Sequence, residues 1–543
     1  MAARAVARRL SRPRAKVRAC ATGTCDRTGT PMPDNNQTKR RGLILLALMC
    51  TMMLAAMDTT IVSTAIPQIV DDLGGFSLFS WVFSIYLLAQ TVTIPVYGKL
   101  SDLYGRKPVL IVGTGIFIAG SVLSSLSWNM VALIGFRGLQ GLGAGAIMAT
   151  VSTLAGDLYS VRERGAVQGW LSSVWGIAAV TGPLLGGFFA EYASWRWIFI
   201  INLPIGVLAI ALIMAFLHET FEKRAPQIDY AGSVLILLAG SAIMFGLLQG
   251  GQSWPWLSWQ SGVVLVVAVV LVALTVGAER RAPQPVMPGW LWRMPVLAGA
   301  NLAVAGMGLV MMAPSSYLPT FLQSVLGMGA IGAGLVLSCT SIGWPVASAV
   351  SGRVYMKIGF RDTAMIGAAM MVAGSVGFLL LPSPQPIWAV ALDQVLLGAG
   401  FGFLSTPLLV GAQSVVGWAG RGVVTGSNMF ARYLGQSLGA ALFGAVFNAA
   451  VAGRIADAPA AVAAEMPGNV NAVIDVLHGA ATSEGARDWL RASIDLANDR
   501  LFLGMALLSV LVFLALFIAP RRFPIHEEDQ AALLATHPAG GAR

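Results

Sequence analysis

Long apolar segments recur along almost all of this chain of 543 residues. A helix of about 20 apolar residues crosses the hydrocarbon core of a bilayer and satisfies its backbone hydrogen bonds internally. Only 11% of the residues are charged and 56% are hydrophobic, whereas soluble domains are about 25% charged. The sequence therefore predicts an all-α integral membrane protein and excludes a soluble globular fold.

Fourteen of these segments qualify as transmembrane helices. We expect them near residues 43–68, 79–99, 109–128, 130–156, 165–190, 198–217, 231–250, 261–277, 297–317, 329–350, 364–381, 386–411, 423–449 and 501–519. They predict a six-helix bundle at 43–217, a linker with two extra transmembrane helices at 218–296, and a second six-helix bundle at 297–519. Residues 520–543 are expected to form a cytoplasmic tail.

The distribution of basic residues sets the expected orientation. If the N-terminus lies inside, the inside loops carry Lys99, Arg106, Lys107, Arg162, Arg164, Lys223, Arg224, Arg280, Arg281, Arg293, Arg353, Lys357, Arg361, Arg421, Arg521 and Arg522. The outside loops carry Arg196 and a few arginines in the loop 450–500. This asymmetry follows the positive-inside rule. We expect a multi-pass protein of the inner (plasma) membrane with both termini in the cytoplasm.

Residues 1–42 form a basic tail with eleven Lys or Arg and two acids, which is nearly all of the net charge of +10. The tail lacks aromatic residues and apolar periodicity, so we expect it to be disordered and cytoplasmic. It is interpreted as a segment attracted to anionic lipid, as an organelle transit peptide, or as untranslated sequence before a start at Met32, which we favour. A protein that starts at Met32 should insert and transport like the full chain, as a vesicle assay at matched expression would measure.

The loop 450–500 is the longest expected external segment, with seven acids and four arginines. It is interpreted either as an extracytoplasmic cap for a partner or as a solvated connector. Tryptophans 254, 256 and 259 fit an interfacial aromatic belt. The four cysteines match neither a zinc site nor a disulfide framework.

Two acids lie well inside the expected helices. Asp58 occupies the first helix, and Asp393 occupies the helix 386–411. An ionised carboxylate at membrane depth is costly, so it faces a cavity, pairs with a cation or carries a proton. The alternative for Asp58 is a purely structural pair or helix cap.

One arginine also lies inside an expected helix. Arg137 lies in the helix 130–156, where it either pairs with an anion or extends its side chain to the nearby interface.

The sequence contains an internal repeat. The segment GKLSDLYGRK (98–107) resembles GRVYMKIGFR (352–361), although Met356 replaces Asp102. Repeated halves are typical of secondary transporters, whose substrate site lies between the halves at the midplane.

Several motifs resemble those of the major facilitator superfamily. GKLSDLYGRKP (98–108) looks like its signature loop between helices 2 and 3, which contributes Gly98, Asp102, Gly105, Arg106 and Lys107. LIGFRGLQGLGAG around Arg137 is similar to the motif that places an arginine inside the membrane. TGPLLGG resembles the antiporter motif through Gly182, Pro183, Gly186 and Gly187.

Two further segments resemble the fourteen-helix drug–proton antiporter branch, the EmrB/QacA type. They are LAAMDTTIVSTAIP around Asp58 and WRWIFIINLPIG around Asn202. The resemblance implies the major facilitator fold and proton-coupled efflux of amphipathic compounds, cations among them, by alternating access. Since Asp58 and Asp393 are the acids well inside the expected helices, we expect them to be the proton-coupling acids. We expect Arg137 to be a charge partner that acts on Asp58 or on the substrate path, and the loop 98–108 to be a cytoplasmic gate in which Asp102 holds a facing helix end.

Alternative functions remain open at this point: export of a single metabolite or antibiotic, or a non-transporting receptor. No histidine cluster, nucleophile elbow or metal spacing indicates an enzyme. We expect no cofactor besides the proton, and as partners small-molecule substrates and the lipid bilayer, with a periplasmic adaptor and outer-membrane channel as candidates and no nucleic acid. Candidate cavity residues are Trp81, Tyr86, Trp175 and Phe199.

Overall fold

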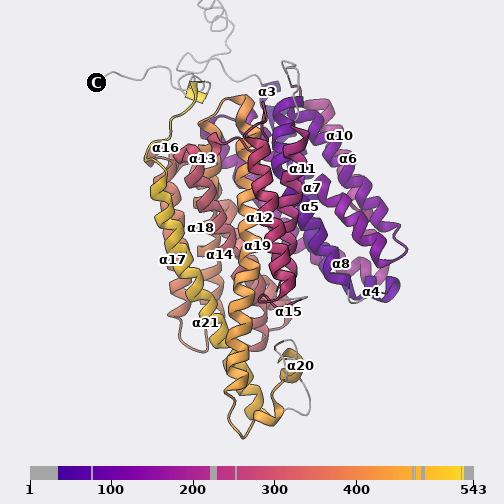
Figure 1. Ribbon diagram of the computed structural model, residues 1–543, viewed down its shortest axis with the longest axis vertical. Helices are drawn as coiled ribbons and strands as arrows, with labels where there is room; N and C mark the ends of the chain where they lie inside the picture. The colour runs from indigo at the N-terminus through magenta and orange to yellow at the C-terminus, as the bar shows by residue number, and fades with distance from the viewer. Residues whose placement is uncertain are drawn as a thin grey trace, which may run out of the picture.

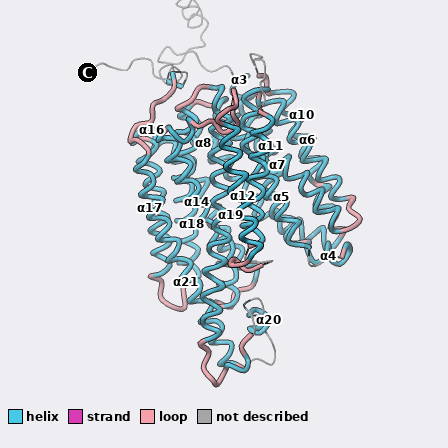
Figure 2. The backbone as a smooth tube through the Cα atoms, in the orientation of Figure 1, coloured by secondary structure: helices cyan, strands magenta, loops and turns pink. Residues whose placement is uncertain are grey.

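The computed structural model describes residues 35–74, 78–219, 229–250, 254–467, 470, 473–478, 483–527 and 529–530. Within these ranges the chain is helical, and the helices are joined by loops (Figure 2). The described part contains 14 helices that are long and apolar enough to cross a membrane. The prediction of fourteen transmembrane helices is therefore confirmed, while the expectations for residues 1–34 lie outside the described residues.

The first bundle packs around a cluster of buried apolar side chains from Ile44 to Leu217, and Met429 and Tyr433 of the second bundle also belong to this cluster. Its helices are α3 (Asn35–Thr64), the short α4 (Ile66–Leu73), α5 (Phe79–Tyr104), α6 (Arg106–Ser125), α7 (Met130–Leu158), α8 (Val161–Tyr192), α9 (Trp197–Ile200) and α10 (Asn202–Phe216).

The second bundle has its own apolar cluster, which runs from Ala300 to Leu516. Its helices are α13 (Trp290–Arg293), α14 (Pro295–Ser324), α15 (Ala330–Ser338), α16 (Thr340–Ile358), α17 (Phe360–Leu379), α18 (Ile387–Ser414), α19 (Trp418–Ala456), α21 (Glu484–Ala515) and η4 (Leu516–Ile518). Because α15 and α16 follow each other directly, together they form one span.

Two further helices, α11 (Tyr230–Gln249) and α12 (Trp259–Glu279), lie outside the bundles. α11 contacts α5 and α19, so it lies at the junction of the two bundles (Figure 1). In α12 only Ala268 is fully buried, and most of its valines and leucines are exposed. An apolar helix with so little protein contact faces lipid.

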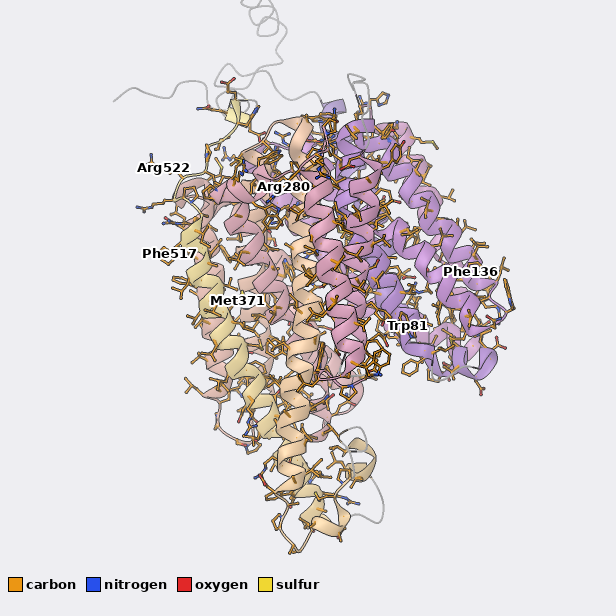
Figure 3. All side chains as sticks on the ribbon, in the orientation of Figure 1. Trp81, Phe136, Arg280, Met371, Phe517 and Arg522 are labelled. Carbon is orange, nitrogen blue, oxygen red and sulfur yellow. The ribbon has the colours of Figure 1, made fainter. Side chains whose placement is uncertain are left out.

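The two ends of the molecule differ. α3 begins and α21 finishes at one end, which we call the terminal end, and α20 (Val473–His478) marks the opposite end (Figure 1). Arg280 and Arg522 lie at the terminal end (Figure 3).

The segment predicted as a loop at 98–108 is mostly helix. α5 continues to Tyr104, and α6 begins at Arg106. Gly105 alone reverses the chain, with φ +94°, a conformation that only glycine adopts without strain. Its repeat counterpart Gly359 has φ +96° and joins α16 to α17 in the same way.

The loop predicted at 450–500 is shorter than expected. α19 continues to Ala456 and α21 begins at Glu484, so both helices project beyond the rest of the bundle (Figure 1). Its 39 residues make α19 about 58 Å long, against about 30 Å of hydrocarbon. Leu477 of α20 packs with Leu490 and Ile494 of α21 in the projection. Hydropathy missed these extensions because their outer turns are polar.

Both predicted tails need correction in their described parts. α3 begins at Asn35, so residues 35–42 are helical. At the other end of the chain, Phe523 is buried against Phe360, and the backbone N–H of His526 donates to the carbonyl oxygen of Ser414 at 2.7 Å. Residues 519–527 therefore pack on the terminal end of the second bundle.

Candidate functional site

A cavity of about 630 Å³ lies between the two bundles, a size typical of small-molecule sites. Both bundles line it: Thr59 and Thr60 come from α3, Trp175 from α8, and Trp344 from α16. Five methionines also line it, and their flexible thioethers adapt to differently shaped apolar ligands. The methionines are Met52, Met148, Met311, Met312 and Met429.

The four aromatic residues predicted at the cavity occupy three different environments. Trp175 lines the cavity. Trp81 instead packs on Phe245 of α11, with ring centroids 5.7 Å apart, in a separate groove. Tyr86 and Phe199 are buried inside the first bundle. The prediction is therefore wrong for Trp81, Tyr86 and Phe199, which do not line the described cavity.

Asp58 forms a fully buried ion pair with Arg137. Its Oδ2 lies 2.5 Å from Nη1 of Arg137, and its Oδ1 accepts a hydrogen bond of 2.7 Å from Nε2 of Gln140. Nη1 of Arg137 also donates to Oε1 of Gln140 at 2.8 Å, and its guanidinium lies 4.3 Å from the Tyr86 ring centroid. We call Asp58, Arg137, Gln140 and Tyr86 the Asp58 cluster.

The Asp58 cluster connects to Asn202, which lies in the other segment that resembles the fourteen-helix antiporter branch. Oγ of Ser121 accepts hydrogen bonds from Nε2 of Gln140 at 3.4 Å and from Nδ2 of Asn202 at 2.9 Å. Asn202 begins α10, and its Oδ1 is buried without a protein partner. The structure therefore brings the Asp58 and Asn202 segments, far apart in sequence, to one polar chain.

Arg137 does not extend to the interface. Its side chain is 1% exposed, and its Nε donates to the carbonyl oxygen of Val82 at 3.2 Å. Two glycines bring α7 close to its neighbours: a Cβ at Gly141 would collide with the backbone of Tyr86, and one at Gly143 with Phe117 of α6. The glycines that follow Arg137 therefore allow α7 to pack closely against α5 and α6.

The second intramembrane acid is separate from this cluster. Asp393 is buried in α18, and its Oδ2 accepts a hydrogen bond of 3.2 Å from Nε2 of Gln394. Its Oδ1 faces Gly374 of α17. Arg137 pairs with Asp58 and not with Asp393, so the two acids do not share one charge partner.

At the terminal end Asp102 joins the two bundles. Its Oδ1 and Oδ2 accept hydrogen bonds from the backbone N–H groups of Gly422 and Val423, both at 2.9 Å, near the start of α19. Gly98 makes this contact possible, because a Cβ there would collide with the backbone of Gly422. The expected contact of Asp102 with a facing helix end is thus present, where a carboxylate is favoured by the helix dipole.

Three arginines and three aspartates form a continuous buried network around this contact. Arg106 pairs with Asp102 at 2.7 Å and with Asp157 at 2.8 Å. Arg421 of α19 pairs with Asp157 at 3.1 Å and with Asp529 at 2.9 Å. Asp529 in turn pairs with Arg164 of α8 at 2.9 Å. We call these six residues the interdomain network, since it runs from the first bundle to the second and back.

The remaining residues of the signature segment fix the start of α6. The backbone N–H groups of Arg106 and Lys107 donate to the Glu219 carboxylate, both at 2.9 Å. Nζ of Lys107 donates to the carbonyl oxygens of Met214 and Leu217, where α10 ends. The negative Glu219 carboxylate thus lies at the N-terminus of α6 and the positive Lys107 ammonium at the C-terminus of α10, where the helix dipoles favour these charges.

The antiporter-like motif packs α8 on α3. A Cβ at Gly182 would collide with Thr60, and one at Gly186 would collide with Thr64. Gly187 points to open space, and Pro183 lies inside α8, where it removes one backbone donor. Since Thr60 of α3 and Gly176 of α8 both line the cavity, this packing joins two helices of the cavity wall.

Sequence reasoning missed Asp157, Arg164, Arg421, Asp529 and Arg432. The first three lie near expected helix ends, where charges are ordinary, and Asp529 lies in an expected tail. Of these five residues, only Arg432 could have been recognised from the sequence, because it is an arginine inside the expected helix 423–449. A search of intramembrane arginines as well as acids would have found it.

Comparison with known proteins decides the family. The family model described as Major Facilitator Superfamily matches residues 48–232 and 228–440. The chain belongs to the Major Facilitator Superfamily.

The chain is 34% identical to "Multidrug resistance protein 3" of Bacillus subtilis (strain 168). The alignment of 420 residues covers 76% of this chain and 81% of the relative. The chain is also 33% identical over 432 residues to "Efflux pump FUS6" of Gibberella fujikuroi, covering 77% of each. The solved proton:xylose symporter XylE superimposes with a TM-score of 0.58 at 14% identity, over 91% of this chain and 99% of XylE. That last likeness supports the fold: two six-helix bundles with α11 and α12 added.

Proposed function

We propose that this protein is a proton-driven efflux antiporter that exports amphipathic compounds through the central cavity by alternating access. The observation that carries the proposal is the buried Asp58–Arg137 pair, because Asp58 directly precedes the cavity-lining Thr59 and Thr60. The printed names of the relatives, a multidrug resistance protein and an efflux pump, support export as the direction.

Protonation of Asp58 supplies the coupling in this proposal. A neutral carboxyl no longer neutralises Arg137, and an uncompensated buried guanidinium is costly. The bundle then repacks so that Arg137 gains water or another anion, which moves α3 and its neighbour α8. Thr60 transmits the movement to the cavity, since its hydroxyl donates to the carbonyl oxygen of Ala178 in α8 at 3.0 Å.

Alternation needs a contact that holds one side closed and then releases. Asp102 on α5 and Gly422 on α19 provide it at the terminal end. The basic loops gather at this end, so we assign it to the cytoplasm and place the protein in the inner (plasma) membrane. The described contacts then correspond to a cytoplasmic side that is closed. Asp393 is proposed as a second titrating acid in the other bundle.

The test is transport by the purified protein in lipid vesicles with an imposed pH gradient. A fluorescent amphipathic compound should accumulate when the gradient is present, and a protonophore should stop accumulation. Several unrelated compounds should be transported if specificity is broad, and one if the protein is a dedicated exporter. Equal fluxes with and without the gradient would exclude proton coupling.

Arg137→Ala should reduce proton-driven transport more than Arg137→Lys. Lysine keeps the positive charge beside Asp58, but it lacks the planar fork that contacts Asp58, Gln140 and Val82 together. Alanine leaves Asp58 buried and unpaired, and breaking such a pair costs about 3–5 kcal/mol, so the melting temperature should fall as well. If both variants transport and melt like the parent, Arg137 has no role in coupling.

A further inference from the structure

Arg432 carries the only charge on the described wall of the central cavity. It lies on α19, beside Tyr433 and one helical turn before Gln436, and all three line the cavity. The other described lining residues are apolar, or carry hydroxyl or amide groups, and none is acidic. The described cavity wall therefore carries one positive charge and no negative charge, whereas the sequence led us to expect cations among the substrates.

The guanidinium of Arg432 has no acidic partner in the described part of the chain. Its Nε is buried without a hydrogen-bond acceptor, and its nearest recorded side-chain interaction is the Tyr433 ring, whose centroid lies 5.1 Å from Cζ. The Tyr433 hydroxyl is also buried without a partner. The described structure thus leaves two buried donors at the cavity unused.

Arg432 cannot reach an interface from its position. It lies 14 residues after Trp418, where α19 begins, which places it about 21 Å along the helix axis from the terminal end. Such a depth is near the middle of the hydrocarbon core, where an arginine needs an anion or water. The buried arginines Arg106, Arg137, Arg164 and Arg421 all have aspartate partners, so the partly buried Arg432 differs from them.

We propose that the cavity recognises amphipathic anions, whose single acidic group pairs with Arg432 while the apolar body lies among the methionines, Trp175 and Trp344. This rests on the proposed function, since it takes the cavity to be the transport site. Arg432 offers a planar fork suited to a carboxylate or sulfonate. Gln436 adds an amide donor on the same helix face, at present 3.8 Å from the sulfur of Met311.

The test compares two ligands that differ only in charge: dansyl-phenylalanine, which has a carboxylate, and its carboxamide. The purified protein in detergent should bind the carboxylate about tenfold more tightly or better, because a hydrogen bond to a charged group contributes more than a neutral one. Arg432→Gln should remove this preference, because it weakens binding of the carboxylate much more than binding of the carboxamide. Arg432→Lys should retain part of it.

Arg454→Gln is the matched control. Arg454 lies on the same helix but outside the cavity, over the ring of Trp489 at 3.9 Å, so its loss should not change the preference. Equal affinities for the two ligands in the parent protein would overturn the anion proposal, even if no variant folds. So would tighter binding of the cation ethidium.

The two proposals fail separately. If the carboxamide is bound and is exported under a pH gradient but the carboxylate has no advantage, the efflux function stands and the anion proposal falls. If the carboxylate binds through Arg432 but no gradient drives its movement, the anion site stands and the proton-driven function falls.

Discussion

Asp58→Asn is expected to abolish transport driven by a pH gradient, reducing it to the background of empty vesicles. Asparagine keeps the shape of the side chain and its contact with Gln140, but it cannot be charged and so cannot exchange a proton. Exchange of labelled for unlabelled substrate at equal pH should persist, because Thr59, Thr60 and the rest of the cavity wall are unchanged. The two assays together separate coupling from binding.

The same substitution leaves Arg137 buried without its counter-charge, at a stability cost of about 3–5 kcal/mol. The double variant Asp58→Asn/Arg137→Gln removes both charges, so its melting temperature should recover relative to the single variant, as a double-mutant cycle would measure. Proton-driven transport should remain absent in both. Undiminished proton-driven transport by a stable Asp58→Asn protein would rule out Asp58 as the coupling acid.

Asp102→Ala is expected to open the terminal end. The substitution removes the acceptor of two backbone N–H groups of α19 and one partner of Arg106. A carboxylate at a helix N-terminus contributes up to about 2 kcal/mol in partly buried geometry, which corresponds to a population shift of roughly thirtyfold. Spin labels at positions 104 and 357, on opposite bundles, should move apart in the variant, as double electron–electron resonance would measure.

The control for this experiment is Asp362→Ala. Asp362 also lies at the terminal end, but it pairs with Arg361 and Arg521 inside the second bundle and does not join the bundles. Its loss should leave the distance between the labels unchanged. Identical distance distributions for Asp102→Ala and the parent would show that Asp102 does not keep this end closed.

The fold was largely predictable because membrane insertion depends on segment length and apolarity. Both are visible in the sequence, and so are rare charges inside apolar segments, such as Asp58 and Arg137. Gly105 and Gly359 could be matched as repeats because a reversal with positive φ needs glycine at the same place in each half.

Other features depended on three-dimensional packing. The direction in which Tyr86 and Phe199 point is set by how helices cross, and apolar segments with low amphipathicity do not reveal it. Asp529 could not be recognised because its partners, Arg164 and Arg421, come from opposite bundles. The outer turns of α19 and α21 are as polar as loops in hydropathy. They are nevertheless helical, and Leu490 and Ile494 of α21 pack in one apolar cluster with Val451 of α19.

The position of Asp529 has a consequence for biosynthesis. A nascent chain emerges from its N-terminus onward, so the first bundle can pack while later helices are still being made. Arg164 and Arg421 are joined by Asp529, which follows the fourteenth membrane helix in the chain. The two halves therefore acquire this joint only after the fourteenth membrane helix has been synthesised, later than the contacts that Asp102 and Asp157 make with the start of α19.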